Sequence, residues 1–230
     1  MSGADRPLLA IDTSTGVAGI ALYGPSGPLA EESWAAGRTQ TATVLHEIDR
    51  LCTLSGLRPA DLGAVAVATG PGSFNGMRVG ISTAKGLVFA LGLPLLGVPT
   101  LDATAYPHGD AGLPVRAVLA AGRGRYVSAL YRWQGGTTRR VGDYENGSLA
   151  DLAALIIEPT LVCGELPHEQ RTEFQAAAPL ARVMPPTLNA RRASCLAEIA
   201  WQRHRRGESD DPATLEPIYV HGTPKVTSNE

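Results

Sequence analysis

Apolar and polar positions divide the chain into short elements whose order occurs twice. Apolar runs bounded by glycine and proline turns predict strands, and apolar residues spaced by three and four predict helices. The first half reads as three strands, helix, strand, helix, strand and helix, over residues 8–11, 17–23, 29–35, 41–54, 64–68, 77–91, 95–98 and from 100 onward. The second half repeats that order over residues 115–120, 126–133, 137–144, 148–157, 161–163, 167–177, 181–184 and 189–206. Because a linker rich in proline and glycine separates the halves, we expect two subdomains, residues 1–106 and 107–230.

A glycine-rich turn between the strand at residues 64–68 and the following helix is the central feature of the first half. Its glycines run Gly70-x-Gly72-x-x-x-Gly76, which matches neither a P-loop nor a dinucleotide fingerprint, and neither Ser73 nor Ser82 is a nucleophile elbow. What remains is a helix N-terminus, which stabilises a bound anion by about 0.3 to 2 kcal/mol. Micromolar binding needs about 8 kcal/mol, so the turn does not bind a nucleotide by itself.

Composition excludes several classes of function. The chain has 230 residues and a formal net charge of -2, so no general basic field attracts nucleic acid. Cys52, Cys163 and Cys195 are far apart and fit reduced thiols rather than a disulfide or metal framework. We see no signal peptide and no apolar stretch long enough to cross a bilayer, and we therefore expect a cytoplasmic protein without membrane contact.

Two tandem copies of this order, each beginning with a strand-turn-strand, resemble the plan of actin, hexokinase and the sugar kinases. The expected fold is therefore α/β, with two ribonuclease-H-like (actin-like ATPase, ASKHA) domains, each a mixed sheet flanked by helices. In that fold the two hairpin turns hold phosphates. The first turn here offers a carboxylate and three hydroxyls as a vestigial nucleotide or phosphate site, although a plain Asx turn explains them equally: Asp12, Thr13, Ser14 and Thr15.

The second hairpin turn lacks the carboxylate that phosphoryl transfer needs. It reads Ala120-Ala121-Gly122-Arg123-Gly124. Because phosphoryl transfer depends on positioning and on cations held by carboxylates, one acidic turn without its counterpart is poorly equipped for it.

Several motifs resemble the bacterial TsaB family, also called YeaZ. The resemblance rests on residues 9–15 (LAIDTST), Arg38–Gln40, Gly70–Gly80 (GPGSFNGMRVG) and Glu216–Val220 (EPIYV). It is strong up to about residue 105 and looser beyond. The chain departs from the family at Asn75 and His221, where threonine and arginine are usual, and at Ala120–Gly122, where Asp-Ala-Arg commonly opens the second hairpin.

The resemblance implies a non-catalytic subunit of the machinery that places a threonylcarbamoyl group on the adenosine next to the anticodon of certain tRNAs. The implied partners are a catalytic paralogue, TsaD, and a small ATPase, TsaE, with tRNA contacted indirectly. Without TsaD, a homodimer is expected. No metal is expected on this chain, because its histidines never occur one helical turn apart. The resemblance assigns no cofactor to this chain by itself and leaves ATP at the interface of the complex as an alternative.

The first-half helices offer a candidate pairing surface. Gly76, Gly80 and Ala84 are spaced by four and would form a flat stripe that admits a partner helix, or would pack on the chain's own sheet. Gly72 and Ser73 belong to the same block. Arg78 lies on another side of the helix, where we favour a structural role.

Two other functions remain as alternatives. A small ATP-dependent kinase of the same superfamily is suggested by Asp12–Thr15 and predicts ATP turnover that Asp12→Ala abolishes. A zinc peptidase is remote, because the paired histidines that hold the metal in the superfamily's metal-bearing relatives are missing.

Overall fold

The computed structural model describes residues 5–36 and 40–220, and divides the chain into two compact units. Unit 1 comprises the chain up to Ala103 together with Arg191–Ile218, and unit 2 begins at Thr104 and continues to Ala190. The units divide between residues 103 and 104, whereas the expected boundary lies between residues 106 and 107. The last helix, however, belongs to unit 1 and not to the second half.

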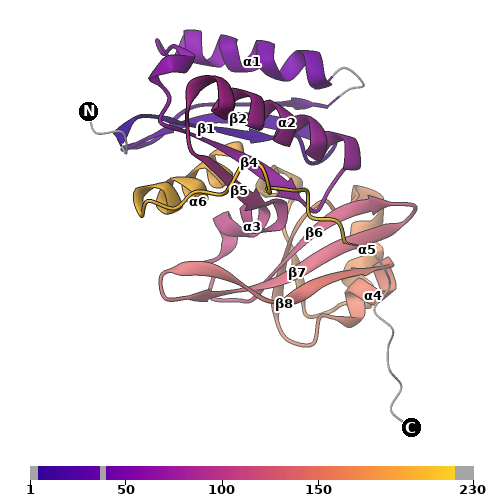
Figure 1. Cartoon of the computed structure of the whole chain (residues 1–230). Helices are drawn as coiled ribbons and strands as arrows, with labels where there is room; N and C mark the ends of the chain where they lie inside the picture. The colour runs from indigo at the N-terminus through magenta and orange to yellow at the C-terminus, as the bar shows by residue number, and fades with distance from the viewer. Residues whose placement is uncertain (1–4, 37–39, 221–230) are drawn as a thin grey trace. The chain divides into compact units, whose positions relative to one another are not determined.

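Unit 1 is a five-stranded mixed sheet with helices on both faces (Figure 1). The strand order is β3-β2-β1-β4-β5, with β1, β2 and β3 antiparallel and β1, β4 and β5 parallel. Its elements are β1 Leu8–Asp12, β2 Val17–Gly24, β3 Gly27–Ala35, α1 Gln40–Leu54, β4 Ala64–Gly70, α2 Phe74–Leu91, β5 Leu95–Pro99 and α6 Ala193–Arg205. Helix α3, Thr100–Ala105, begins in unit 1 and ends in unit 2.

Side-chain alternation along the strands divides the core of unit 1 into two layers. Residues such as Leu9 and Ile11 point toward α1 and α2, where they meet Ile81 and Val88. The alternate positions, among them Leu8 and Ala10, point toward α6. The apolar stripe predicted on the last helix therefore covers the first sheet, and its residues are buried there: Ala193, Leu196, Ala197, Ala200 and Trp201.

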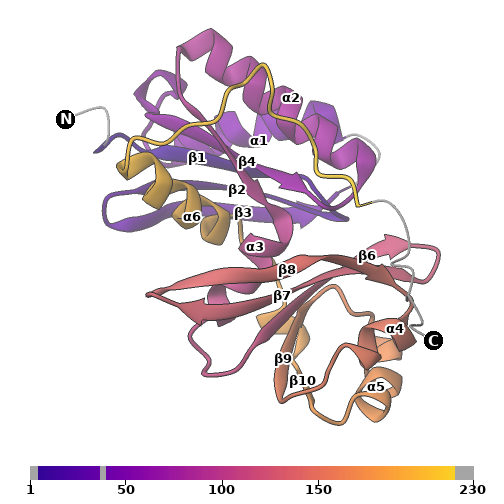
Figure 2. The ribbon, with the colours of Figure 1, turned by 60° about the horizontal axis from the view of Figure 1, so that its bottom comes forward.

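The segment after α6 returns along unit 1 (Figure 2). The Asp210 backbone N–H donates to the Leu95 carbonyl at 2.8 Å, and the Ile218 N–H donates to the Thr69 carbonyl at 2.7 Å. The Asp210 carboxylate also accepts from the Gly97 N–H at 2.7 Å. The bonds to Leu95 and Gly97 occupy backbone groups at the β5 edge, which would otherwise be open to pairing with another chain.

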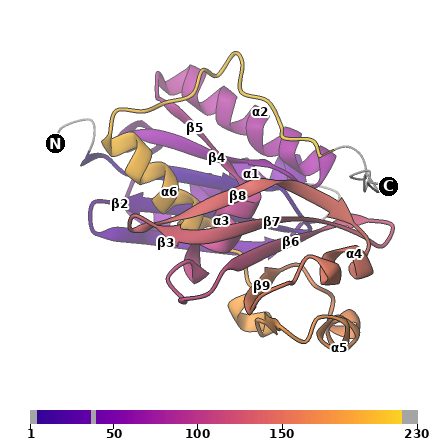
Figure 3. The same cartoon turned by 90° about the horizontal axis from the view of Figure 1, so that it is seen from below.

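Unit 2 repeats the arrangement of unit 1. Its sheet has the order β10-β9-β6-β7-β8, in which β6 to β10 take the places of β1 to β5. Figure 3 shows α4 and α5 on one side of this sheet, where Val118, Val162 and Phe174 pack together. The elements are β6 Val115–Gly122, β7 Arg125–Gln134, β8 Thr137–Gly147, α4 Leu149–Ala154, β9 Thr160–Gly164, α5 His168–Ala177 and β10 Ala181–Val183. The predicted pair of ribonuclease-H-like domains is confirmed.

Candidate functional site

The turn between β1 and β2 is buried, and its polar groups are bonded to the chain itself. Asp12, Thr13, Ser14 and Thr15 are each no more than 6% exposed. The Ser14 N–H and hydroxyl both donate to Asp12 Oδ1, at 2.9 and 2.6 Å. The Thr13 hydroxyl donates to the Gly76 carbonyl at 2.7 Å. Hydroxyls engaged in this way are not directed at a ligand.

An arginine from just before α6 neutralises the carboxylate of this turn. Arg191 Nε donates to Asp12 Oδ2, and the two side chains are only 7% and 4% exposed. Arg191 Nη2 donates to Thr15 Oγ1 at 2.7 Å and to the Val17 carbonyl at 3.1 Å. With Oδ1 held by Ser14 and Oδ2 by Arg191, the chain supplies the counter-charge that a metal or substrate cation would otherwise provide.

The glycine-rich block is shaped to receive this turn. A Cβ on Gly72 would lie 2.1 Å from the Ser14 carbonyl oxygen, and one on Gly76 would lie 2.1 Å from the Thr13 carbonyl oxygen. A Cβ on Gly80 would lie 2.5 Å from Thr13 Oγ1. These glycines therefore allow α2 to approach the β1–β2 turn, a contact that a larger residue would prevent.

The stripe of small residues on α2 therefore lies inside unit 1. Gly76, Gly80 and Ala84 are buried, with Ala84 in the core layer beneath α1 and α2. These residues therefore pack inside their own unit, and they are not exposed on the surface, as residues of a partner interface would have to be. Ser73 caps the helix, since its side chain accepts from the Gly76 N–H at 3.3 Å. This cap starts α2 at Phe74, three residues earlier than predicted.

The outer face of α2 carries the exposed part of the block. Arg78 is exposed, and its guanidinium carbon lies 4.1 Å from the centre of the Phe74 ring. Phe74 is 51% exposed, and Phe89, four turns further along the same face, is 92% exposed. On α1, Leu45 is 53% exposed. We name Leu45, Phe74, Arg78 and Phe89 the outer helical face.

The corresponding turn of unit 2 is built differently. Ala120, Ala121 and Gly122 are exposed. The turn continues with φ angles of 77° at Gly122, 53° at Arg123 and 69° at Gly124, a left-handed conformation that glycine adopts most easily. The turn contains no carboxylate, as the sequence indicated.

The structure also reveals a cavity in unit 2 that the sequence did not indicate. It has a volume of about 330 Å³ and lies at the carboxyl ends of β6 and β9. Asn189 uses its amide internally, because Oδ1 accepts from the Gly164 N–H at 3.1 Å and Nδ2 donates to the Met184 carbonyl at 2.9 Å. The surface that lines the cavity is mainly apolar. The residues that line it are Ala120, Gly164, Glu165, Leu166, Pro167, His168, Arg171, Pro186 and Asn189.

The described residues contain neither a metal-binding cluster nor a membrane-spanning helix. Between residues 5–36 and 40–220, no group of three or more His, Cys, Asp and Glu side chains could hold a metal ion. Within the same ranges, no helix combines the length and apolar character needed to cross a bilayer. Arg38 and Thr39 of the second motif, and His221, lie outside the described residues.

The cysteines are expected to be unreactive in the folded chain. Burial raises the pKa of the Cys163 thiol to about 12 and that of Cys195 to about 11. Because the thiolate is the nucleophile, both groups stay protonated near neutral pH. We expect alkylation by iodoacetamide at pH 8 to be slow for both cysteines in the native chain and fast in urea, measured by mass spectrometry of peptides. Rapid native labelling of Cys163 would contradict its burial.

Solved structures share the fold. YeaZ from Pseudomonas aeruginosa superposes with a TM-score of 0.73 at 23% identity, covering 94% of this chain and all of that one. A ROK family protein from Streptococcus pneumoniae gives a TM-score of 0.51 at 10% identity. The repeated sheet and its two hairpin turns define a protein of the actin-like ATPase class.

Sequence comparisons identify the family to which the chain belongs within this class of protein. The family model described as TsaD, tRNA N6-adenosine threonylcarbamoyltransferase, matches residues 35–209. The chain is 30% identical over 160 residues to the tRNA threonylcarbamoyladenosine biosynthesis protein TsaB of Bacillus subtilis, covering 68% of this chain and 70% of that protein. An uncharacterized protein of Mycobacterium tuberculosis is 37% identical over 218 residues, covering 93% and 90%. The chain belongs to the TsaB family.

Proposed function

We propose that this protein is a non-catalytic subunit in the biosynthesis of threonylcarbamoyladenosine in tRNA, and that it acts by pairing with a TsaD-type catalytic protein. The observation that carries the proposal is the buried Arg191–Asp12 pair, which fills the carboxylate site where a phosphotransferase of this fold would act. The relatives from Bacillus subtilis and Escherichia coli, named for this biosynthesis, support the pathway. The E. coli match spans 61% of that protein.

We place the pairing surface on the outer helical face. Leu45, Phe74 and Phe89 expose apolar side chains on adjacent helices, while Gly76, Gly80 and Ala84 hold α2 against its own unit. Exposed aromatic residues beside an arginine are typical of the centre of a protein interface. The same face would serve a homodimer in the absence of TsaD. A TsaE-type ATPase joins the complex, and the assembly works in the cytoplasm.

Co-elution of the full chain with its TsaD-type protein tests the pairing. We expect the wild-type chain to form the complex and Phe89→Asp to abolish it, because the charge would be desolvated at the interface. Ile157→Asp is the matched control, since Ile157 is 83% exposed but lies in unit 2. Failure of the wild-type chain to pair, or equal pairing by Phe89→Asp, would contradict this assignment.

A measurement of ATP turnover distinguishes the proposed non-catalytic subunit from the alternative of an ATP-dependent kinase. The purified chain should hydrolyse ATP no faster than buffer, because Asp12 is already paired with Arg191. Turnover that Asp12→Ala removes would instead establish an enzyme.

A further inference from the structure

Charge is distributed unevenly along unit 2. Residues 104–142 contain a single acidic residue, Asp110, and six arginines: Arg116, Arg123, Arg125, Arg132, Arg139 and Arg140. Residues 143–190 contain two arginines and seven acidic residues. The net charge of -2 for the whole chain therefore hides a basic region that covers β6, β7 and the first half of β8.

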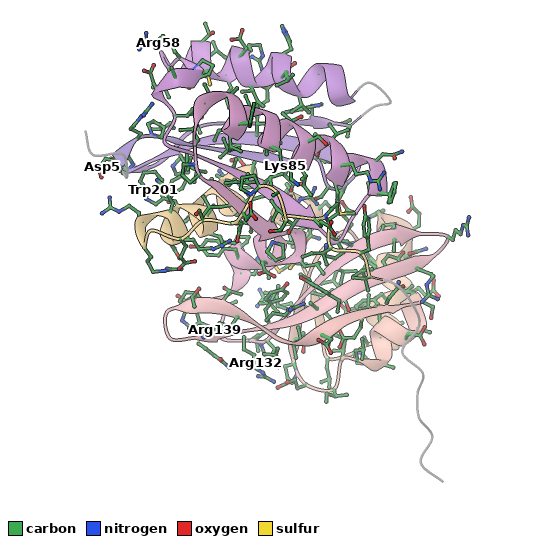
Figure 4. All side chains as sticks on the ribbon, viewed as in Figure 1. Asp5, Arg58, Lys85, Arg132, Arg139 and Trp201 are labelled. Carbon is green, nitrogen blue, oxygen red and sulfur yellow. The ribbon has the colours of Figure 1, made fainter. Side chains whose placement is uncertain are left out.

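The β7–β8 hairpin carries cationic and aromatic side chains along its length, of which Trp133, Arg139 and Arg140 are exposed and Arg132 and Tyr144 are partly buried. Arg132 on β7 lies directly opposite Arg139 on β8, and both are labelled near the end of the hairpin in Figure 4. Trp133 is 43% exposed, and the Arg140 guanidinium carbon lies 4.1 Å from the centre of the Tyr144 ring. We name Arg132, Trp133, Arg139, Arg140 and Tyr144 the cationic ribbon.

The chain does not neutralise this ribbon fully. Arg132 pairs with Glu158, but among the described residues no carboxylate lies within ion-pair distance of Arg139 or Arg140. Glu158 offsets the charge of Arg132, so the excess positive charge of the ribbon comes from Arg139 and Arg140. Two exposed arginines of unit 1 are paired by contrast, Arg58 with Asp61 and Arg205 with Asp5.

We propose that the cationic ribbon binds the phosphate backbone of tRNA, an inference that rests on the proposed function and adds a direct RNA contact to it. Arginine guanidinium groups suit phosphate oxygens, and an exposed aromatic ring such as that of Trp133 gives an unpaired base a surface to stack on. An acidic protein segment would use the charges but not this combination. Asp143 is exposed on the same strand, and its negative charge would repel a bound phosphate.

Titration of a tRNA transcript at several salt concentrations tests the contact, using the full chain alone and in complex with its TsaD-type partner. Each lost phosphate contact should lower the slope of log affinity against log salt by about 0.7 to 0.9. Arg139→Ala/Arg140→Ala should therefore flatten the slope by roughly 1.4 to 1.8 and weaken binding at least about tenfold at low salt. Asp143→Asn should strengthen binding, and Arg58→Ala, a paired arginine of unit 1, should change neither quantity.

The outcomes separate this inference from the proposed function. If the double variant binds tRNA with wild-type affinity and salt slope, or if the wild-type chain and its complex bind no tRNA at low salt, the ribbon is not an RNA contact, whether or not the chain pairs with TsaD. If pairing fails in the co-elution experiment but the slope still falls, the ribbon contact stands and the scaffold function does not. Thermal melting of each variant confirms that the sheet is intact.

Discussion

Replacing Arg191 by methionine is expected to lower the free energy of unfolding of unit 1 by about 3 to 5 kcal/mol. The substitution keeps an apolar side chain of similar length but leaves the Asp12 carboxylate buried, with its side chain 4% exposed and without its cation. Thr15 and the Val17 carbonyl lose their donors at the same time. A loss of this size results from removing one partner of a buried ion pair, and does not equal the net contribution of the pair.

Arg192→Met is the matched control, one residue along the chain. Arg192 pairs with Glu31, but its side chain is 62% exposed, so solvent screens the pair and its removal should cost less than about 1 kcal/mol. Asp12→Leu combined with Arg191→Met should recover much of the loss, because no unpaired charge remains. Hydrogen exchange of the β1 and β2 amides in urea reports on unit 1 by itself. Equal effects of the two arginine substitutions would show that burial of the pair does not matter.

The fold could be predicted from the sequence because the signals for its strands and helices lie in residues that are neighbours along the chain. Strands β1, β2 and β4 are short apolar runs between turn residues, and the capping box of Ser148 and Asp151 begins α4 as expected. The repeated order of elements then selects the architecture. The assignment of α6 could not follow from this, because its apolar stripe shows that it covers a sheet but does not identify which of the two sheets it covers.

The candidate site depended on contacts between distant residues. Asp12 and its hydroxyl neighbours stood out in the sequence, but Arg191 lies 179 positions away and beside a second arginine of the same type. No periodicity or motif distinguishes the buried member of that pair. The spacing of Gly76 and Gly80 is visible in the sequence, but their role is set by the Thr13 backbone and side chain, which only the folded chain brings to them.

Gly76→Ala is expected to destabilise unit 1 by at least about 3 kcal/mol. The added methyl group would lie 2.1 Å from the Thr13 carbonyl oxygen, and the obstacle is backbone rather than a flexible side chain. Either α2 or the β1–β2 turn must move. Such a movement would also strain the 2.7 Å hydrogen bond from the Thr13 hydroxyl to the Gly76 carbonyl.

Gly86→Ala, in the same helix, is expected to have the opposite effect on stability. A Cβ at Gly86 meets nothing within 4 Å, so the change should stabilise the helix by roughly 0.5 to 1 kcal/mol through the higher helix propensity of alanine. Urea unfolding of the two variants should therefore move the midpoint in opposite directions. A Gly76→Ala chain as stable as wild type would mean that α2 does not rest on the β1–β2 turn. Since α2 and Arg191 both contact that turn, such a result would also weaken the proposal that the turn is closed to a phosphate.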